Sequence, residues 1–150
     1  MVELGSTTDP WIGFHFTVEI EGVQEAKFTD CSGLEAKVDV FEYQEGGVND
    51  FIHKLPGRRS FSNVTLKRGV TSSTHLWQWL HRLATKSAKS SEKKNISIVL
   101  YDKKGTEVFR WNLINAYPVK WTGPTMQTGQ SAVLVETLEL AFQEFTIAQG

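Results

Sequence analysis

The sequence predicts a mainly β (α+β) fold, namely a β-sandwich or barrel with one packed α-helix. Three observations support this class: short segments alternate apolar and polar residues, turn residues separate them at regular intervals, and one longer segment has helical periodicity. The chain has 150 residues, of which 40% are hydrophobic, so it is long enough to bury its own core. We therefore expect one domain over residues 1–150.

The first half of the chain contains several segments of strand character. The clearest alternation runs from Phe14 to Glu21, where every second residue is apolar, which predicts a half-buried strand. Gly22 is expected to turn the chain into a second short strand, so that the two form a hairpin. In the third strand, apolar residues occur on both faces, including Val40 on one and Phe41 on the other. The expected strands in this half are 14–21, 26–31, 35–43 and 61–67.

One segment predicts an amphipathic helix over residues 74–87. The run Thr71–Thr74 offers several possible N-cap side chains directly before it. Trp79 is expected beside the buried face of this helix. The residues that fall on that face are Leu76, Leu80, Leu83 and Ala84.

The second half returns to strand patterns after a polar, lysine-rich connector. Residues 95–100 alternate, and the turn sequence 102–105 precedes a partner strand, which predicts a second hairpin. Pro118 falls within a further strand and makes it edge-like or bulged. Alternation over 132–145 is long enough for a strand that bends or spans two layers. The remaining expected strands are 107–113, 117–122 and 132–145.

Catalytic and metal-binding patterns are absent from the sequence. The single cysteine, Cys31, has no partner for a disulfide or a zinc site and is expected to be a half-buried small residue. His75 and His81 are six positions apart, about 240° out of register on a helix, so they cannot share a metal. No nucleophile elbow or phosphate loop occurs. We expect no enzymatic activity, no cofactor and no metal.

The N-terminal residues have neither the basic region nor the apolar core of a secretory signal. No window reaches the roughly 20 apolar residues of a transmembrane helix. We therefore expect synthesis in the cytoplasm and no membrane insertion by this chain.

Charge is distributed unevenly along the chain, although the formal net charge is only −1. Residues 1–51 hold 11 acidic and 2 basic residues, residues 52–104 hold 2 and 12, and residues 105–150 hold 4 and 2. These opposite charges can pair within one chain, or they can attract another copy head to tail. Charge alone does not decide between the two.

A nucleic-acid-binding module is the main alternative of another class. A basic run accompanies two tryptophans near the expected helix, and such a combination can contact phosphates and stack bases. The small net negative charge argues against general attraction to nucleic acid. The residues concerned are Trp77, Trp79, Arg82, Lys86, Lys89, Lys93 and Lys94.

The connection at about 44–59 is expected to be a projecting loop. It is longer than most connections in a compact domain, and long ordered loops are often functional. Its glycines permit close backbone approach, its aromatic residue offers an apolar anchor, and its cations can meet acidic residues of a neighbouring copy. The candidate contact residues are Gly46, Gly47, Phe51, Lys54, Pro56, Gly57, Arg58 and Arg59.

Many short sequence blocks occur together in an order that points to one family. With them the chain closely resembles, over nearly its whole length, the tail tube proteins of contractile phages and of phage-like contractile injection systems. The blocks are Asp9-Pro10, 14–22, Cys31-Ser32-Gly33-Leu34, 42–47, 54–58, 65–70, Trp77-Gln78-Trp79, Arg110-Trp111, 115–120 and 136–140.

This resemblance implies a structural subunit that assembles six to a ring, with rings stacked into a rigid tube. The implied partners are further copies, a sheath protein, baseplate and tube-terminating proteins, and a tape-measure protein, DNA or an effector in the lumen. The polar face of the first strand, with His15, Thr17 and Glu19, is one candidate lining of that lumen. We interpret residues 44–59 as the contact between stacked rings. A ring protein of type VI secretion that carries effectors is the alternative.

Overall fold

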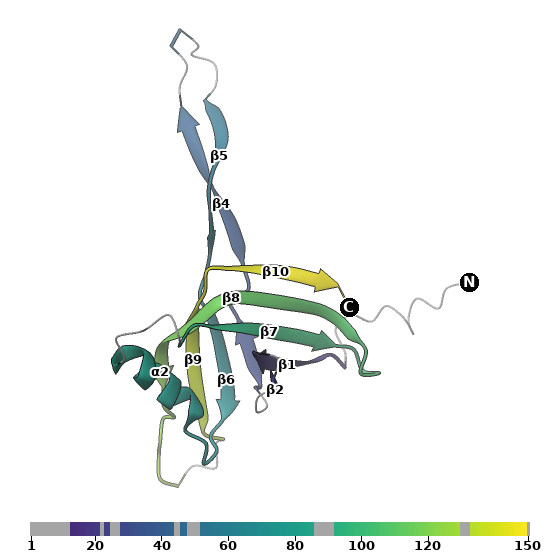
Figure 1. The fold of residues 1–150 in the computed structure, drawn as a ribbon, viewed down its shortest axis with the longest axis vertical. Helices are drawn as coiled ribbons and strands as arrows, with labels where there is room; N and C mark the ends of the chain where they lie inside the picture. The colour runs from purple at the N-terminus through teal and green to yellow at the C-terminus, as the bar shows by residue number, and fades with distance from the viewer. Residues whose placement is uncertain are drawn as a thin grey trace, which may run out of the picture.

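The computed structural model describes residues 13–21, 23–24, 28–43, 46–47, 52–85, 92–129 and 133–149. Strands predominate and one helix is present among the described residues, which confirms the mainly β class (Figure 1). The elements are β1 (His15–Ile20), β2 (Val23–Gln24), β3 (Asp30–Ser32), β4 (Ala36–Tyr43), β5 (His53–Phe61), β6 (Val64–Gly69), α2 (His75–Thr85), β7 (Lys94–Tyr101), β8 (Glu107–Thr122), β9 (Val135–Ala141) and β10 (Glu144–Gln149).

The long strand β8 joins two layers of the fold. Its first part pairs with β7 on one side and β10 on the other, and its last part pairs with β9. The strand order is therefore β2-β1-β7-β8-β9-β6-β3, with β10 also on β8. Sequence reasoning expected two strands here, over 107–113 and 117–122. That division is wrong, because one continuous strand runs through this point and only bends there.

Asn115 lies at the bend of β8. It has a positive φ of 54°, a conformation that asparagine tolerates better than most residues. Its backbone N–H donates to Asn95 Oδ1 at 3.1 Å, and its Nδ2 donates to Gln143 Oε1 at 2.9 Å. The register against β9 then shifts at Pro118, as the bulge prediction requires. The two layers thus meet around one hydrogen-bonded corner.

One expected strand pairing and two expected strand boundaries are wrong. β1 pairs with β2 and with β7, whereas residues 30–32 form β3 on β6 in the other layer. The early pairing of β2 follows from the tight turn at Glu21, whose φ is 52°. The alternation over 132–145 belongs to two strands, since Gln143 N–H donates to Ile114 O and redirects the chain from β9 to β10. The expected strand 61–67 is likewise the end of β5 and most of β6.

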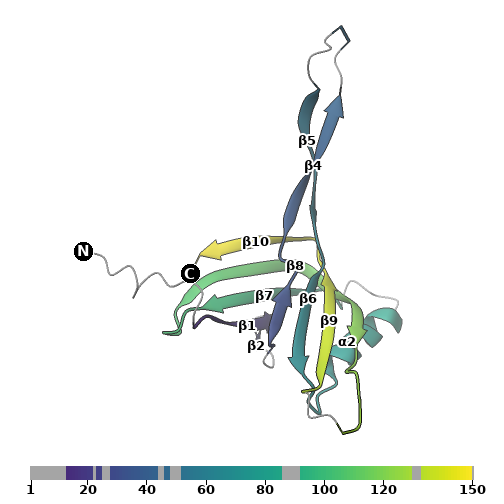
Figure 2. The same ribbon diagram turned by 180° about the vertical axis from the view of Figure 1, so that it is seen from behind.

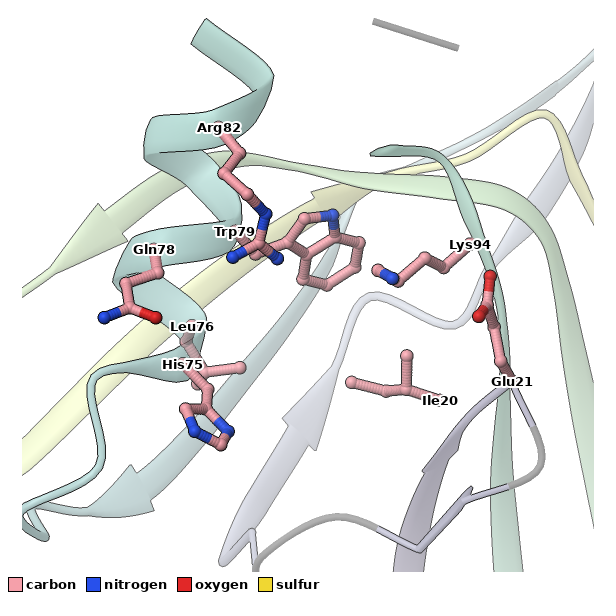
Figure 3. Close-up of a pocket in the computed structure, with 8 residues that line it drawn as sticks. All are labelled: Ile20, Glu21, His75, Leu76, Gln78, Trp79, Arg82 and Lys94. Carbon is pink, nitrogen blue, oxygen red and sulfur yellow. The ribbon is translucent and has the colours of Figure 1, made fainter. Parts of the chain in front are cut away.

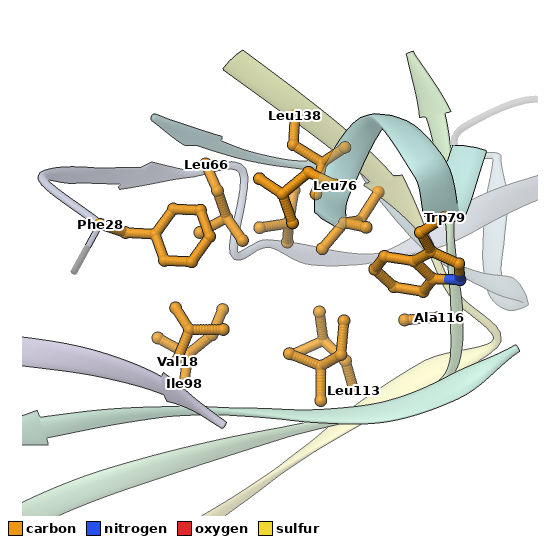
Figure 4. Close-up of a cluster of buried hydrophobic side chains, with 12 residues drawn as sticks. Val18, Phe28, Leu66, Leu76, Trp79, Ile98, Leu113, Ala116 and Leu138 are labelled. Carbon is orange, nitrogen blue, oxygen red and sulfur yellow. The ribbon is translucent and has the colours of Figure 1, made fainter. Parts of the chain in front are cut away.

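The core lies between the two layers and beneath α2 (Figure 4). Thr74 accepts the first helical hydrogen bond from Gln78, so the helix begins where the cap pattern placed it. Leu76 and Trp79 are its buried residues, Leu80 and Leu83 are half-buried, and Ala84, which was expected on the buried face, is exposed because it lies in the last turn. The expected end at Ser87 lies outside the described residues. The buried core residues include Val18, Val64, Leu66, Ile96, Ile98, Leu113, Ala116, Leu138 and Leu140.

A buried ion pair connects β6 to β9. Arg68 and Glu136 face each other in register, and the arginine Nε donates to the carboxylate of its partner. Trp121 Nε1 donates to the other oxygen of Glu136 at 3.0 Å, and the guanidinium of Arg68 stacks over the ring of Phe28. Both charges are nearly inaccessible to solvent. Removing either partner would therefore leave the other charge buried and unpaired.

Candidate assembly surface

A two-stranded hairpin formed by β4 and β5 projects from the rest of the fold (Figures 1 and 2). We call this hairpin the arm and the remaining elements the body. The strands pair antiparallel from Ala36 with Phe61 to Tyr43 with His53. Residues 53–59 are therefore strand and not part of a loop at 44–59. The projecting segment is thus a hairpin held by cross-strand hydrogen bonds, and not the loop that the sequence pattern predicted.

The Pro56-Gly57 pair lies in a β-bulge and not in a turn. The register shifts between Val38 and Val40, so that one β4 residue, Asp39, faces two residues of β5. A proline is tolerated at a bulge or on an edge strand because it has no N–H to donate. A side chain at Gly57 would come within 3.0 Å of the Asp39 carbonyl oxygen, which explains the glycine. The bulge bends and twists the arm.

Every residue of β4 is exposed, including its apolar ones. Val40 is 62% exposed and Phe41 is 58% exposed, on opposite faces of the strand. An isolated two-stranded hairpin is marginally stable in water, so apolar residues on both faces indicate a surface that another molecule covers. The sequence analysis did not include these β4 residues in the site, although apolar residues on both faces of 35–43 were the available signal.

The base of the arm is fixed to the body by polar and aromatic contacts. Arg59 donates to Glu144 of β10 at 2.7 Å and lies over the ring of Phe61. Phe61 also packs against Phe142 and Phe145 of the body, with ring centroids 5.9 and 5.0 Å apart. Since these contacts are confined to the base, the outer part of the arm keeps its direction through its own strand pairing.

The candidate contact residues that the structure describes all belong to the arm. Gly46 and Gly47 lie exposed at its tip, and Gly47 has a φ of 86°. Lys54 pairs in register with Glu42, and Arg58 is exposed at the bulge. Arg59 differs from the others because it already has a partner in its own body. Phe51 lies outside the described residues.

The side of β1, β7 and β8 that faces away from the core carries a polar cluster around the buried Val99. Arg110 donates to Glu19 at 3.0 Å and to Glu107 at 2.9 Å. Hydrogen bonding from Arg110 holds the pKa of Glu107 below its usual range, and both carboxylates raise the pKa of the guanidinium. His15 stacks on Tyr101 at 5.2 Å. The first strand thus has a polar face, as its alternation predicted.

The structure also bears on the other candidate sites. Among the described residues, no group of three metal-binding side chains occurs and no helix is long and apolar enough to cross a membrane. Cys31 is partly buried, and this burial raises the pKa of its thiol to about 11. Its thiol therefore remains protonated and weakly nucleophilic at neutral pH.

The basic and aromatic surface proposed for nucleic acid is interrupted. Trp79 is only 3% exposed and its indole N–H donates to Glu92 O at 2.7 Å, so this ring cannot stack on a base. Arg82 is paired with Glu92, and Lys93 lies over the ring of Tyr117. Lys86 and Lys89 lie outside the described residues. Trp77 is exposed but stacks on His81.

Comparison with known proteins gives a consistent match over the whole fold. Residues 13–146 match the model of the family described as T4-like virus tail tube protein gp19. No curated protein matches the chain in sequence.

Solved structures extend this match. A chain from the tube-terminating cap of the anti-feeding prophage is 31% identical, with a TM-score of 0.78 over 90% of this chain and 88% of that one. A chain from the extended sheath–tube complex of an extracellular contractile injection system is 25% identical, with a TM-score of 0.81 over 100% of both chains. Hcp1 of Flavobacterium johnsoniae is 15% identical with a TM-score of 0.59 over 90% and 95%, which is a likeness of fold alone.

Proposed function

The chain belongs to the T4-like virus tail tube protein family, and from this membership we propose that it is the structural subunit of the rigid inner tube of a contractile ejection machine. The observation that carries the proposal is the match to a chain of a sheath–tube complex over the full length of both. In this proposal six copies form a ring and rings stack into a hollow tube. The resulting particle is a phage tail or a phage-tail-like injection system.

The arm supports a role in stacking. Its exposed apolar residues need a cover, and a tube of repeated subunits supplies one on every neighbouring copy. Lys54 and Arg58 remain exposed and can meet carboxylates of that neighbour, while the backbone at Gly46 and Gly47 permits close approach. We therefore retain the assignment of the inter-ring contact to the tip and outer strands of the arm. Arg59 fixes the base of the arm instead.

The same proposal defines the partners. Sheath, baseplate and tube-terminating proteins would contact the outside and the ends of the tube, and a tape-measure protein, DNA or an effector would occupy its lumen. The polar face around Arg110 is suited to a water-filled channel, since it exposes hydrogen-bonding groups and few apolar ones. The function is mechanical, so we expect no catalytic turnover. The likeness to Hcp1 supports the shared fold and does not favour a type VI ring over a tube.

Removal of the arm tests this proposal. Val38 and Arg59 face each other in register, so residues 39–58 can be replaced by Asn-Gly, which closes a two-residue hairpin between them. The body has its own core and should stay folded, whereas tubes should be lost. The measurements are the circular dichroism melt and electron microscopy of concentrated protein. The double substitution Lys104→Glu/Lys120→Glu, on exposed positions of the body, is the control and should still give tubes.

If the chain without the arm still forms tubes as long as those of the parent, the stacking contact lies elsewhere. A parent protein that remains monomeric at all concentrations, even with a nucleating baseplate present, would contradict the tube function itself.

A further inference from the structure

A cavity of about 450 Å³ lies between α2 and the ends of β1 and β7 (Figure 3). We call it the socket. Its floor is apolar and is made by Ile20, Leu76 and the ring of Trp79, which is held in place by its hydrogen bond to Glu92 O. Its volume lies within the range of roughly 300–1,000 Å³ that is typical of binding sites. The proposed function leaves this cavity without a role.

The rim of the socket is cationic. Figure 3 shows the side chains of Arg82 from α2 and Lys94 from β7 directed toward Trp79. Arg82 uses its Nε for Glu92 at 3.3 Å, which leaves its two terminal amino groups for another partner. Lys94 has no ion pair among the described residues, and Glu21 is the one carboxylate of the lining. The socket therefore suits a carboxylate next to an apolar side chain.

The ion pairs between described residues account for little of the charge asymmetry of the chain. Those between described residues join Arg59 to Glu144, Arg68 to Glu136, Arg82 to Glu92, and Arg110 to Glu19 and Glu107. None of them joins a carboxylate of residues 1–51 to a lysine or arginine of residues 52–104. The described charges that these pairs do not include can therefore meet opposite charges of another copy.

The arm offers the matching chemistry. Asp39 and Phe41 are two positions apart on β4, so they lie on the same face, about 7 Å from each other. Both are exposed, and Asp39 has no ion pair among the described residues. Figure 1 shows the arm projecting from one end of the body and α2 on the part of the body away from the arm tip. Complementary surfaces at different ends of one chain give a head-to-tail contact between copies.

We propose that the socket receives the arm of a second copy, with Phe41 over the accessible apolar lining at Ile20, and with Asp39 facing Arg82 and Lys94. The inference rests on the proposed function, because it requires copies to assemble. It adds to the proposed function a specific partner surface for one face of β4. The opposite face of β4, with Val40 and Glu42, is not used in this contact.

A charge exchange tests this contact. Lys94→Glu and Asp39→Lys each place like charges together and should raise the protein concentration needed for tube formation about tenfold or more. The double variant restores an opposite pair and should return to within about threefold of the parent. Arg82 is left intact because it holds the buried Glu92. Tube formation is measured by light scattering and electron microscopy.

Two controls separate the contact from general effects of charge. Lys104→Glu and Lys120→Glu each make the same reversal of charge on an exposed site of the body, and both should remain within about threefold of the parent. Thermal melts of the unassembled variants should match the parent and so exclude misfolding. The inference is overturned if Lys94→Glu polymerises like the parent, or if the double variant stays as defective as the single ones. A parent that never assembles overturns the proposed function and this inference together.

Discussion

The strands β9 in the body and β4 in the arm have similar lengths and mixed apolar and polar residues, yet their surroundings are opposite. In β9 every second residue is buried, with Leu138 and Leu140 at 1% and 0% exposure, whereas all residues of β4 are exposed. The difference is the number of neighbours, since β9 lies between β6 and β8 and β4 pairs only with β5. The body thus buries its own apolar residues, while the arm exposes apolar residues that the proposed assembly would cover.

The largest contrast between the two regions is expected for their ion pairs. Arg68→Met leaves Glu136 charged inside the body and should destabilise the chain by about 3–5 kcal/mol. Arg59→Met removes the pair with Glu144, whose partners are 62% and 33% exposed, and should cost only about 0–1 kcal/mol. Urea unfolding of the two variants measures the difference. Adding Glu136→Gln to Arg68→Met removes the unpaired charge and should restore part of the loss; equal effects of the two arginine variants would contradict this view of the body.

Apolar truncations should differ in the same direction. Leu140→Ala creates a cavity at a fully buried position and should cost about 2–5 kcal/mol. Val40→Ala, at a residue that is 62% exposed, should change the stability of the unassembled chain by no more than about 0.5 kcal/mol. The check combines denaturant unfolding with a tube assay, in which Val40→Ala is expected to matter more than it does for folding. A loss of several kcal/mol from Val40→Ala in the unassembled chain would show that the arm is part of the core.

The pattern of residues predicted most of the body because its strands bury one face. Alternation in 14–21, 95–100 and 132–140 locates β1, β7 and β9, and the cap sequence before His75 locates the start of α2. The pairing of β1 could not be predicted in the same way. Its alternation fits the expected hairpin with 26–31 as well as the observed pairing with β2 and β7. Local pattern specifies a strand but not its neighbour.

The arm was the less predictable region. Pro56-Gly57 is typical of a turn, and only the partner strand, with its bulge opposite Asp39, makes the pair compatible with a strand. The projecting segment was located, but its strands and its exposed apolar residues were not assigned to the site. An exposed apolar residue cannot be distinguished from a buried one in the sequence, since its cover belongs to another molecule. Among the socket residues, Leu76 and Trp79 were expected on or beside the buried face of the helix, and Arg82 and Lys94 were assigned to the candidate nucleic-acid surface.

The bend of β8 allows a smaller effect to be measured within the body. Asn115 has a positive φ, so Asn115→Ala should cost about 1–2 kcal/mol through backbone strain, in addition to its lost hydrogen bond to Gln143. Asn115→Gly relieves the strain and should lose less. Thermal unfolding of the two variants gives the order. The expectation fails if alanine is tolerated as well as glycine, which would mean that the two layers do not depend on this corner.

The smallest expected effect concerns pH and tests the body alone. Arg110 lowers the pKa of Glu107 in the folded chain, chiefly by hydrogen bonding. A lowered pKa means that the folded state binds a proton less readily than the unfolded one, whose glutamates titrate near about 4.3. The contribution of Glu107 is therefore present above that pH and is lost as the pH falls through the folded value. Glu107→Gln should make unfolding in urea less sensitive to acid between neutral pH and about pH 3. The expectation fails if Glu107→Gln and the parent lose stability equally as the pH falls, which would mean that the hydrogen bonds of Arg110 do not stabilise the body.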